Sequence, residues 1–172
     1  TIMRKILFAV LAAFFAIPSF AGVKLVSGSV DALSGEKNIQ VTLNWEKAVY
    51  DKWGTLTNFL DLAVRNKTWE SASTGYFCQQ ATLKTAKLGL RFAESKENEV
   101  TTNYYFEIVT TTINKDGSIA GELLLKKKGE SEPIAVFSFK SDDEDKTDKI
   151  TFRDQFSSIG KSLGKFIVKQ LI

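Results

Sequence analysis

The densest group of side chains that could do chemistry is an acidic loop, residues 141–149, which reads SDDEDKTDK. Carboxylate oxygens are the ligands that hard cations such as calcium prefer. The loop lacks the glycine and the distal glutamate of an EF-hand, and two lysines within it partly neutralise its charge. The pattern therefore favours a solvated connector over a metal site. Four aspartates are the candidate ligands of the alternative: Asp142, Asp143, Asp145 and Asp148.

Histidine is absent from the chain, and Cys78 is its one cysteine. This composition excludes Ser-His-Asp and Cys-His nucleophilic sites and every histidine-ligated metal site. A lone thiol forms neither an internal disulfide nor a CxxC redox pair. Carboxylates remain as acid–base groups, as in glycosidases, but no two of them share an expected cleft. The sequence therefore predicts no catalytic residue and no cofactor, and it disfavours enzyme activity.

Aromatic side chains form a second candidate group, because their rings can stack on sugars or bases. Trp45 lies on the apolar side of an alternating segment, which predicts that it packs in the core. The other two tryptophans flank an expected helix, where aromatic residues commonly cover the end of a core. Packing therefore explains these rings better than a ligand platform does. The six residues are Trp45, Trp53, Trp69, Tyr76, Tyr104 and Tyr105.

The N-terminal residues 3–21 read MRKILFAVLAAFFAIPSFA and have the layout of a secretory signal peptide. A positively charged start, an apolar run over residues 6–17 and a proline precede the small residues that signal peptidase requires. The apolar run is shorter than the roughly 20 residues that a membrane span needs. We therefore expect residues 1–21 to be removed by cleavage between Ala21 and Gly22. No cysteine follows the apolar run, so we do not expect a lipoprotein anchor.

The chain carries 23 basic and 20 acidic residues, and loss of Arg4 and Lys5 with the leader leaves 21 against 20. An almost neutral protein gives no electrostatic argument for nucleic-acid binding. About 150 residues are enough for one compact domain to bury around 68–70% of its unfolded surface. We expect residues 22–172 to form a single globular domain, secreted or periplasmic. The scarcity of cysteine in an exported protein favours a bacterial source.

Lysines are the remaining candidate group, in the run Lys126 to Lys128 and in the last expected helix. Such lysines could attract phosphates or anionic lipid. Lysine at strand ends and on exposed helix faces is also a common protection against edge pairing. With a nearly neutral chain, the sequence favours this second interpretation and predicts no nucleic-acid partner and no stable membrane insertion after cleavage.

Alternation of apolar and polar residues predicts five strands. In the clearest, Ile39, Val41, Leu43 and Trp45 alternate with polar residues. Turn chemistry at residues 114–117 and 128–132 joins the last three strands into an antiparallel meander. The expected strands cover residues 23–30, 39–46, 103–113, 118–127 and 133–139.

Apolar residues three and four apart predict three helices, over residues 56–64, about 76–89 and 151–171. Gly160 and Gly164 lie beside the stripe of the last helix and permit a close approach to a neighbour. The fold class is α+β: a sheet of about five strands, antiparallel or mixed, with two to three helices packed on it in the order β-β-α-α-β-β-β-α. The residues expected to be buried together are Val41, Leu43, Trp45, Phe59, Leu60, Phe106, Leu123, Phe137, Phe156 and Leu163.

Three stretches together resemble uncharacterised exported proteins of Bacteroidetes-type bacteria: residues 23–28 after the leader, residues 104–109 with the meander, and residues 160–166. More distantly, the order of elements is similar to the small α/β periplasmic domains of envelope-assembly lipoproteins, including penicillin-binding-protein activators. The chain departs from these lipoproteins because it has no lipobox cysteine. The resemblance implies export and an accessory role, and it supplies no catalytic residues.

We therefore expect an exported, non-enzymatic accessory or binding module of the bacterial envelope that acts through a protein partner. A carrier of a small apolar ligand or lipid is the first alternative. A carboxylate-based hydrolase of envelope polysaccharide is the second.

Overall fold

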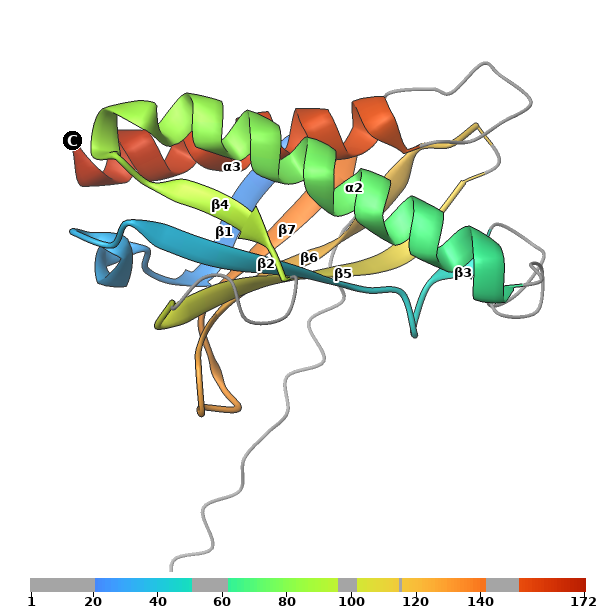
Figure 1. The fold of residues 1–172 in the computed structure, drawn as a ribbon, viewed down its shortest axis with the longest axis horizontal. Coiled ribbons are helices and arrows are strands. Elements are labelled where there is room, and N and C mark those ends of the chain that lie inside the picture. The colour runs from blue at the N-terminus through green and yellow to red at the C-terminus, as the bar shows by residue number, and fades with distance from the viewer. Residues whose placement is uncertain (1–20, 51–61, 96–101, 115, 142–151) are drawn as a thin grey trace, which may run out of the picture.

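The computed structural model describes residues 21–50, 62–95, 102–114, 116–141 and 152–172, with side chains of the first helix described from residue 72 onward. Seven strands and two α-helices, with two short 3-10 turns, make up this part of the chain (Figure 1). Their bounds are β1 Gly22–Gly28, η1 Asp31–Leu33, β2 Asn38–Asn44, β3 Val49–Tyr50, α2 Leu62–Thr85, η3 Ala86–Leu88, β4 Arg91–Glu94, β5 Tyr104–Ile113, β6 Ile119–Lys127, β7 Pro133–Ser141 and α3 Arg153–Leu171.

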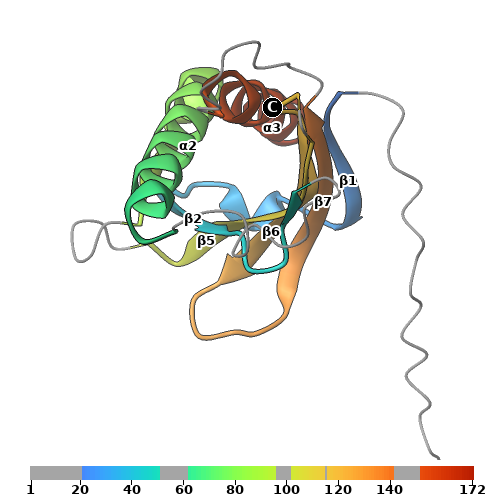
Figure 2. The same ribbon diagram turned by 90° about the vertical axis from the view of Figure 1, so that its right-hand side faces the viewer.

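The seven strands form one mixed sheet in the order β1-β7-β6-β5-β2-β4, with β3 also paired to β5. The pairs β1–β7, β7–β6 and β6–β5 are antiparallel, whereas β2 runs parallel to both β5 and β4, and β3 runs parallel to β5. Both helices cover the same face of this curved sheet (Figure 2). Within the described residues, neither helix has a stretch that is both long and apolar enough to cross a bilayer.

Buried and half-buried side chains alternate along the strands, because one face of the sheet packs under the helices and the other does not. On β5, Phe106 and Ile108 are fully buried, whereas Glu107 between them is half-buried. Side chains of the half-buried set point away from the helices, and we call this side of the sheet the open face. Its residues on the four central strands include Gln40, Thr42, Asn44, Tyr105, Glu107, Val109, Glu122, Leu124, Lys126, Val136 and Ser138.

Helices α2 and α3 run parallel and touch through glycine. A Cβ placed on Gly160 would meet the backbone of Phe77, and one on Gly164 would meet Ala81 and Lys84. Both contacts advance by four residues in the same direction, so the two axes run side by side (Figure 1). The close approach expected from the two glycines of the last helix is confirmed.

Phenylalanine rings fill the layer between the helices and the sheet. Consecutive ring centroids from Phe77 to Phe92, Phe106, Phe137 and Phe166 lie 6.3, 6.0, 6.2 and 5.3 Å apart. These separations are those of favourable aromatic pairs. The series runs from α2 through β4, β5 and β7 to α3, so its rings pack both helices against the sheet.

The expected core is confirmed where the structure describes it. Six of its residues are buried, and Leu43 and Trp45 are partly buried against them. Phe59 and Leu60 lie outside the described residues. The six buried residues are Val41, Phe106, Leu123, Phe137, Phe156 and Leu163.

The expected fold class holds as an α+β domain with a mixed sheet, but the count of elements differs. Strands β3 and β4 were not expected. Strand β4 has four residues, RFAE, with Phe92 as its one large apolar side chain, so it is too short to show a period. Its pairing with the distant strand β2 forms it.

The expected separation of a helix over residues 56–64 from one over about 76–89 is wrong, because α2 is one helix from Leu62 to Thr85 that continues through Thr74 and Gly75. The Thr74 hydroxyl donates a 2.9 Å hydrogen bond to Glu94 on β4, and Gly75 lies against the same carboxylate. A polar contact therefore takes the place of an apolar stripe here, which explains why the periodicity failed. The residues 56–61 of the first expected helix lie outside the described part of the chain.

Candidate functional site

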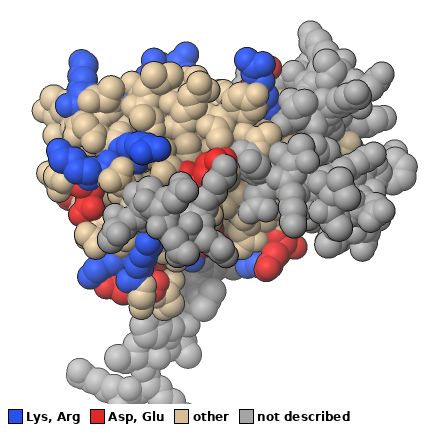
Figure 3. Space-filling view, in the orientation of Figure 1, with Lys and Arg blue, Asp and Glu red and all other residues tan. Residues whose placement is uncertain are grey.

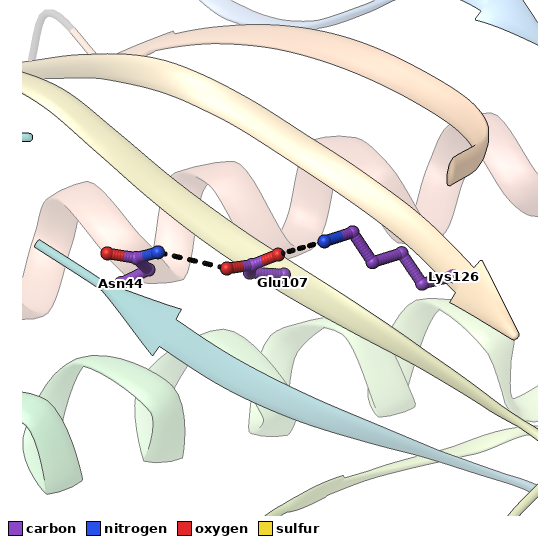
Figure 4. Close-up of polar contacts among 3 residues, drawn as sticks. All are labelled: Asn44, Glu107 and Lys126. Carbon is purple, nitrogen blue, oxygen red and sulfur yellow. Dashed lines mark hydrogen bonds and ion pairs between the residues drawn. The ribbon is translucent and has the colours of Figure 1, made fainter. Parts of the chain in front are cut away.

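The open face of the sheet holds a network of three polar side chains from three neighbouring strands (Figure 4). Glu107 lies at the middle of β5, with Asn44 at the end of β2 on one side and Lys126 near the end of β6 on the other. The register pairs Glu107 with Thr42 and Leu124, so both partners reach it diagonally. Long side chains span such diagonals readily.

Each oxygen of the Glu107 carboxylate has its own donor. Asn44 Nδ2 donates to Oε1 at 3.0 Å, and Lys126 Nζ donates to Oε2 at 2.6 Å. The side chains of Lys126 and Glu107 are only 18% and 19% exposed. The other end of the Asn44 amide accepts a hydrogen bond from the Glu46 backbone N–H, which fixes its orientation. The network is therefore pre-organised on a rigid sheet.

Two opposing effects set the charge of the central carboxylate. Burial raises the pKa of Glu107, but hydrogen bonds from Lys126 and Asn44, with the positive charges of Lys126 and Lys47, outweigh it and leave the pKa below its ordinary value. The hydrogen bond to Glu107 in turn raises the pKa of Lys126 above its ordinary value. At neutral pH the pair is ionised, so Glu107 acts as a fixed acceptor rather than as a proton donor.

The register also brings a second carboxylate to this face. Glu122 on β6 lies diagonal to Glu107, on the side opposite Lys126, and diagonal neighbours in antiparallel strands are about 7–8 Å apart. Sequence spacing did not reveal this juxtaposition. A glycosidase needs one carboxyl group that stays protonated, and the pKa of Glu107 moves in the opposite direction. The geometry suits recognition of a partner better than acid catalysis.

Acid should weaken the contribution of this network to folding. A carboxylate with a lowered folded-state pKa stabilises the protein above the unfolded-state pKa of about 4.3, and that stabilisation is lost as the pH falls through the folded-state value. We expect Glu107→Gln to cost about 1 kcal/mol or less at neutral pH, because the pair is partly exposed. Urea unfolding should show this cost shrink as the pH falls below about 4.3 and vanish below the folded-state pKa.

The matched control for this prediction is Lys126→Met, which removes the ammonium and keeps the stem. In that background the cost of Glu107→Gln should lose most of its pH dependence, as expected when two mutated residues interact. An unchanged pH dependence would show that Lys126 does not hold the carboxylate.

The candidate metal ligands Asp142, Asp143, Asp145 and Asp148 lie outside the described residues. Among the residues that the structure describes, no three His, Cys, Asp or Glu side chains are grouped to hold a metal ion. At the expected cleavage site, Ala21 directly precedes β1, and Gly22 is the first residue of that strand.

The aromatic residues do not gather into one platform within the described side chains. Trp45 packs under the helices, 5.6 Å from Phe152 and 6.1 Å from Phe156 between ring centroids, as expected of a core residue. Tyr104 packs against the core, so its neighbour Tyr105 points to the open face. On the outer side of the helices, the Arg153 guanidinium lies 5.4 Å from the centroid of Tyr76. Trp53 and Trp69 have no described side chains.

Cys78 is buried on α2, and burial, with the negative charge of Glu94, raises the pKa of its thiol to about 12. A thiol that stays protonated is a poor nucleophile. Of the lysine run, Lys126 joins the open-face network, and Lys127 pairs with Glu130 across the following turn at 3.0 Å. Two lysines of the run therefore form ion pairs with different glutamates, one on β5 and one in the turn after β6.

The chain matches no protein-family model and no curated protein sequence. Among solved structures it is similar to PelC from Paraburkholderia phytofirmans, crystallised as a dodecamer, with 13% identity over 87% of this chain and 97% of that one and a TM-score of 0.41. A point variant of that dodecamer is 11% identical, over 84% of this chain and 95% of that one, with a TM-score of 0.43. The structure of an uncharacterised protein is 11% identical, over 78% of this chain and 91% of that one, with a TM-score of 0.40. Similarity at this level does not assign a family.

Proposed function

We propose that this protein is an exported, non-enzymatic accessory module of the bacterial envelope that binds a protein partner through the open face of its sheet. The observation that carries this proposal is the Asn44–Glu107–Lys126 network, which holds opposite charges in fixed positions on a face that the helices leave uncovered. Fixed, partly desolvated charges give specificity to a protein interface.

Apolar side chains beside the network supply the area that such an interface buries. Leu124 pairs across the strands with both Glu107 and Val136, and Val109 lies on the same face of β5. All of these side chains are partly buried rather than fully exposed, and they sit on strands whose other face is locked into the core. A rigid surface of mixed apolar and charged groups is the usual composition of a reversible protein interface.

The two alternatives draw less support from the described residues. A carrier encloses its ligand, but phenylalanine rings occupy the layer between helices and sheet. A carboxylate hydrolase would use Glu107 and Glu122, and the lowered pKa of Glu107 does not suit that residue to the role of the acid.

A photo-crosslinking residue tests the proposal directly. Placed at Leu124 in the producing cells, it should yield one discrete cross-linked protein, whereas placed at the exposed Ser34 it should not. Adding Val136→Glu, which puts a charge on the open face without touching the core, should lower that yield about tenfold. Identical products from Leu124 and Ser34, or none from Leu124, would contradict the proposal.

A further inference from the structure

The outer surface of the two helices carries most of the excess positive charge of the described side chains. Five of the fourteen described basic side chains lie on the two helices and a sixth, Lys87, lies on the η3 turn directly after α2, but only one of the ten described acidic ones, Asp154, lies there. In Figure 3 blue atoms accordingly follow the margin of the molecule where α2 and α3 lie, and most red atoms lie below it. We call this surface the basic helix layer; its cations are Lys84, Lys87, Arg153, Lys161, Lys165 and Lys169.

The lysines of the basic helix layer are not neutralised by neighbours. Within the described part of the chain, none of the five forms an ion pair. Lys84, Lys87 and Lys169 lie in or just after the last turns of helices, where the helix dipole favours a cation. The dipole of the last turn does not account for Lys161 and Lys165, because both are nearer the middle of α3. Among the described residues, the charges of Lys161 and Lys165 therefore have neither an ion-pair partner nor a helix terminus beside them.

The arrangement of these cations is spread out rather than convergent. Lys161, Lys165 and Lys169 repeat every four residues along one ridge of α3, over about 12 Å of helix axis. The parallel helix α2 adds Lys84, whose stem packs against Gly164. A small anion would need donors that surround a point, whereas a row of separate ammonium groups on a pair of parallel helices matches an extended layer of negative charge.

An exposed apolar side chain projects from the same surface. Leu83 on α2 is 61% exposed, beside Lys84 and one turn before Lys87. An exposed large apolar side chain with lysines beside it is the pattern of a helix that rests on a bilayer surface, with its apolar group among the lipid headgroups and its lysines on the phosphates. Lysine is also suited to this task because its ammonium acts as a mobile point charge and not as a bidentate fork.

We infer that the basic helix layer is a docking surface for a bilayer that contains anionic phospholipid. This surface lies on the side of the domain opposite the open face, so a partner on the sheet and a bilayer on the helices can be bound together. The association is peripheral and reversible, because charge and one leucine supply it. Its failure would leave the proposed role of the open face standing.

Vesicle sedimentation tests the inference with a chain that begins at Gly22, which contains every helix and strand described. We expect binding to vesicles of phosphatidylcholine with about one-third phosphatidylglycerol, none to phosphatidylcholine alone, and loss of binding when salt rises from about 0.1 M to about 1 M. The double variant Lys161→Glu/Lys165→Glu should bind at least about tenfold more weakly. Leu83→Ala should weaken binding by roughly threefold to tenfold.

The matched control is Lys127→Glu/Lys128→Glu, which makes the same change in net charge at the β6–β7 turn, outside the basic helix layer. It should keep binding within about twofold, and circular dichroism should confirm that both double variants fold. Equal losses in the two double variants would overturn the inference, because net charge alone would then explain binding. Equal binding to neutral vesicles, or tighter binding to a DNA duplex or an acidic polypeptide than to anionic vesicles, would overturn it as well.

Discussion

Replacing Gly160 by alanine should destabilise this protein by about 2 kcal/mol or more, although alanine in place of glycine normally strengthens a helix by about 1 kcal/mol. A Cβ at this position would lie 3.0 Å from the Cα and carbonyl carbon of Phe77, and closer still to its oxygen. Backbone atoms cannot rotate away as a flexible side chain does. Helix α3 must therefore move off α2, and the rings packed beneath both helices lose contact.

Equilibrium unfolding in urea measures this loss, and the neighbouring exposed position supplies the control. Lys161→Ala changes the same helix one residue away and should alter the free energy of unfolding by less than about 0.5 kcal/mol. Gly160→Val should cost more than Gly160→Ala, because its two extra methyl groups enlarge the same clash. A stabilised Gly160→Ala variant would mean that the two helices are farther apart than described.

Truncation of Phe137 to alanine should cost about 3–5 kcal/mol. Its ring is fully buried within the aromatic series, 6.2 Å from the ring of Phe106 and 5.3 Å from that of Phe166. Removing it leaves a cavity bordered by the sheet on one side and α3 on the other. Neither layer can collapse into the cavity without disturbing the hydrogen-bonded strands or the glycine contact between the helices.

The adjacent residue of β7 tests whether the effect belongs to the core. Val136 points to the open face, and Val136→Ala should cost about 1 kcal/mol or less. The difference between the two alanine variants, measured by thermal and urea unfolding, separates the core from the open face. Similar losses at both positions would show that the open face is also packed against something in the folded protein.

Much of the sheet was predictable because alternation is a local property. In a strand whose every second side chain packs under a helix, apolar residues recur at every second position of the sequence, as on β2, β5, β6 and β7. Strands β5 and β6 are joined where a turn is expected, and the Gly117 N–H donates a 2.9 Å hydrogen bond to the Asn114 carbonyl there. The apolar stripe of α3 likewise identified its buried face.

The candidate site was not predictable from the sequence. Asn44, Glu107 and Lys126 occupy polar positions of three alternating segments, which the pattern assigns to a solvated face. Nothing in that pattern says that two of those strands lie on either side of the third. In the sequence Lys126 is part of a lysine run, but its partner Glu107 lies 19 positions earlier along the chain.

By itself, the sequence determined which segments form strands, which form helices and which side of each is apolar, because these properties follow from the order of neighbouring residues. The tertiary structure alone decided that β2 runs parallel to β5 and β4, that α2 continues through Thr74 and Gly75, and that the helix lysines share one surface. Each of these depends on residues far apart in the chain. Pairing across such separations is fixed by packing, so a local pattern contains no record of it.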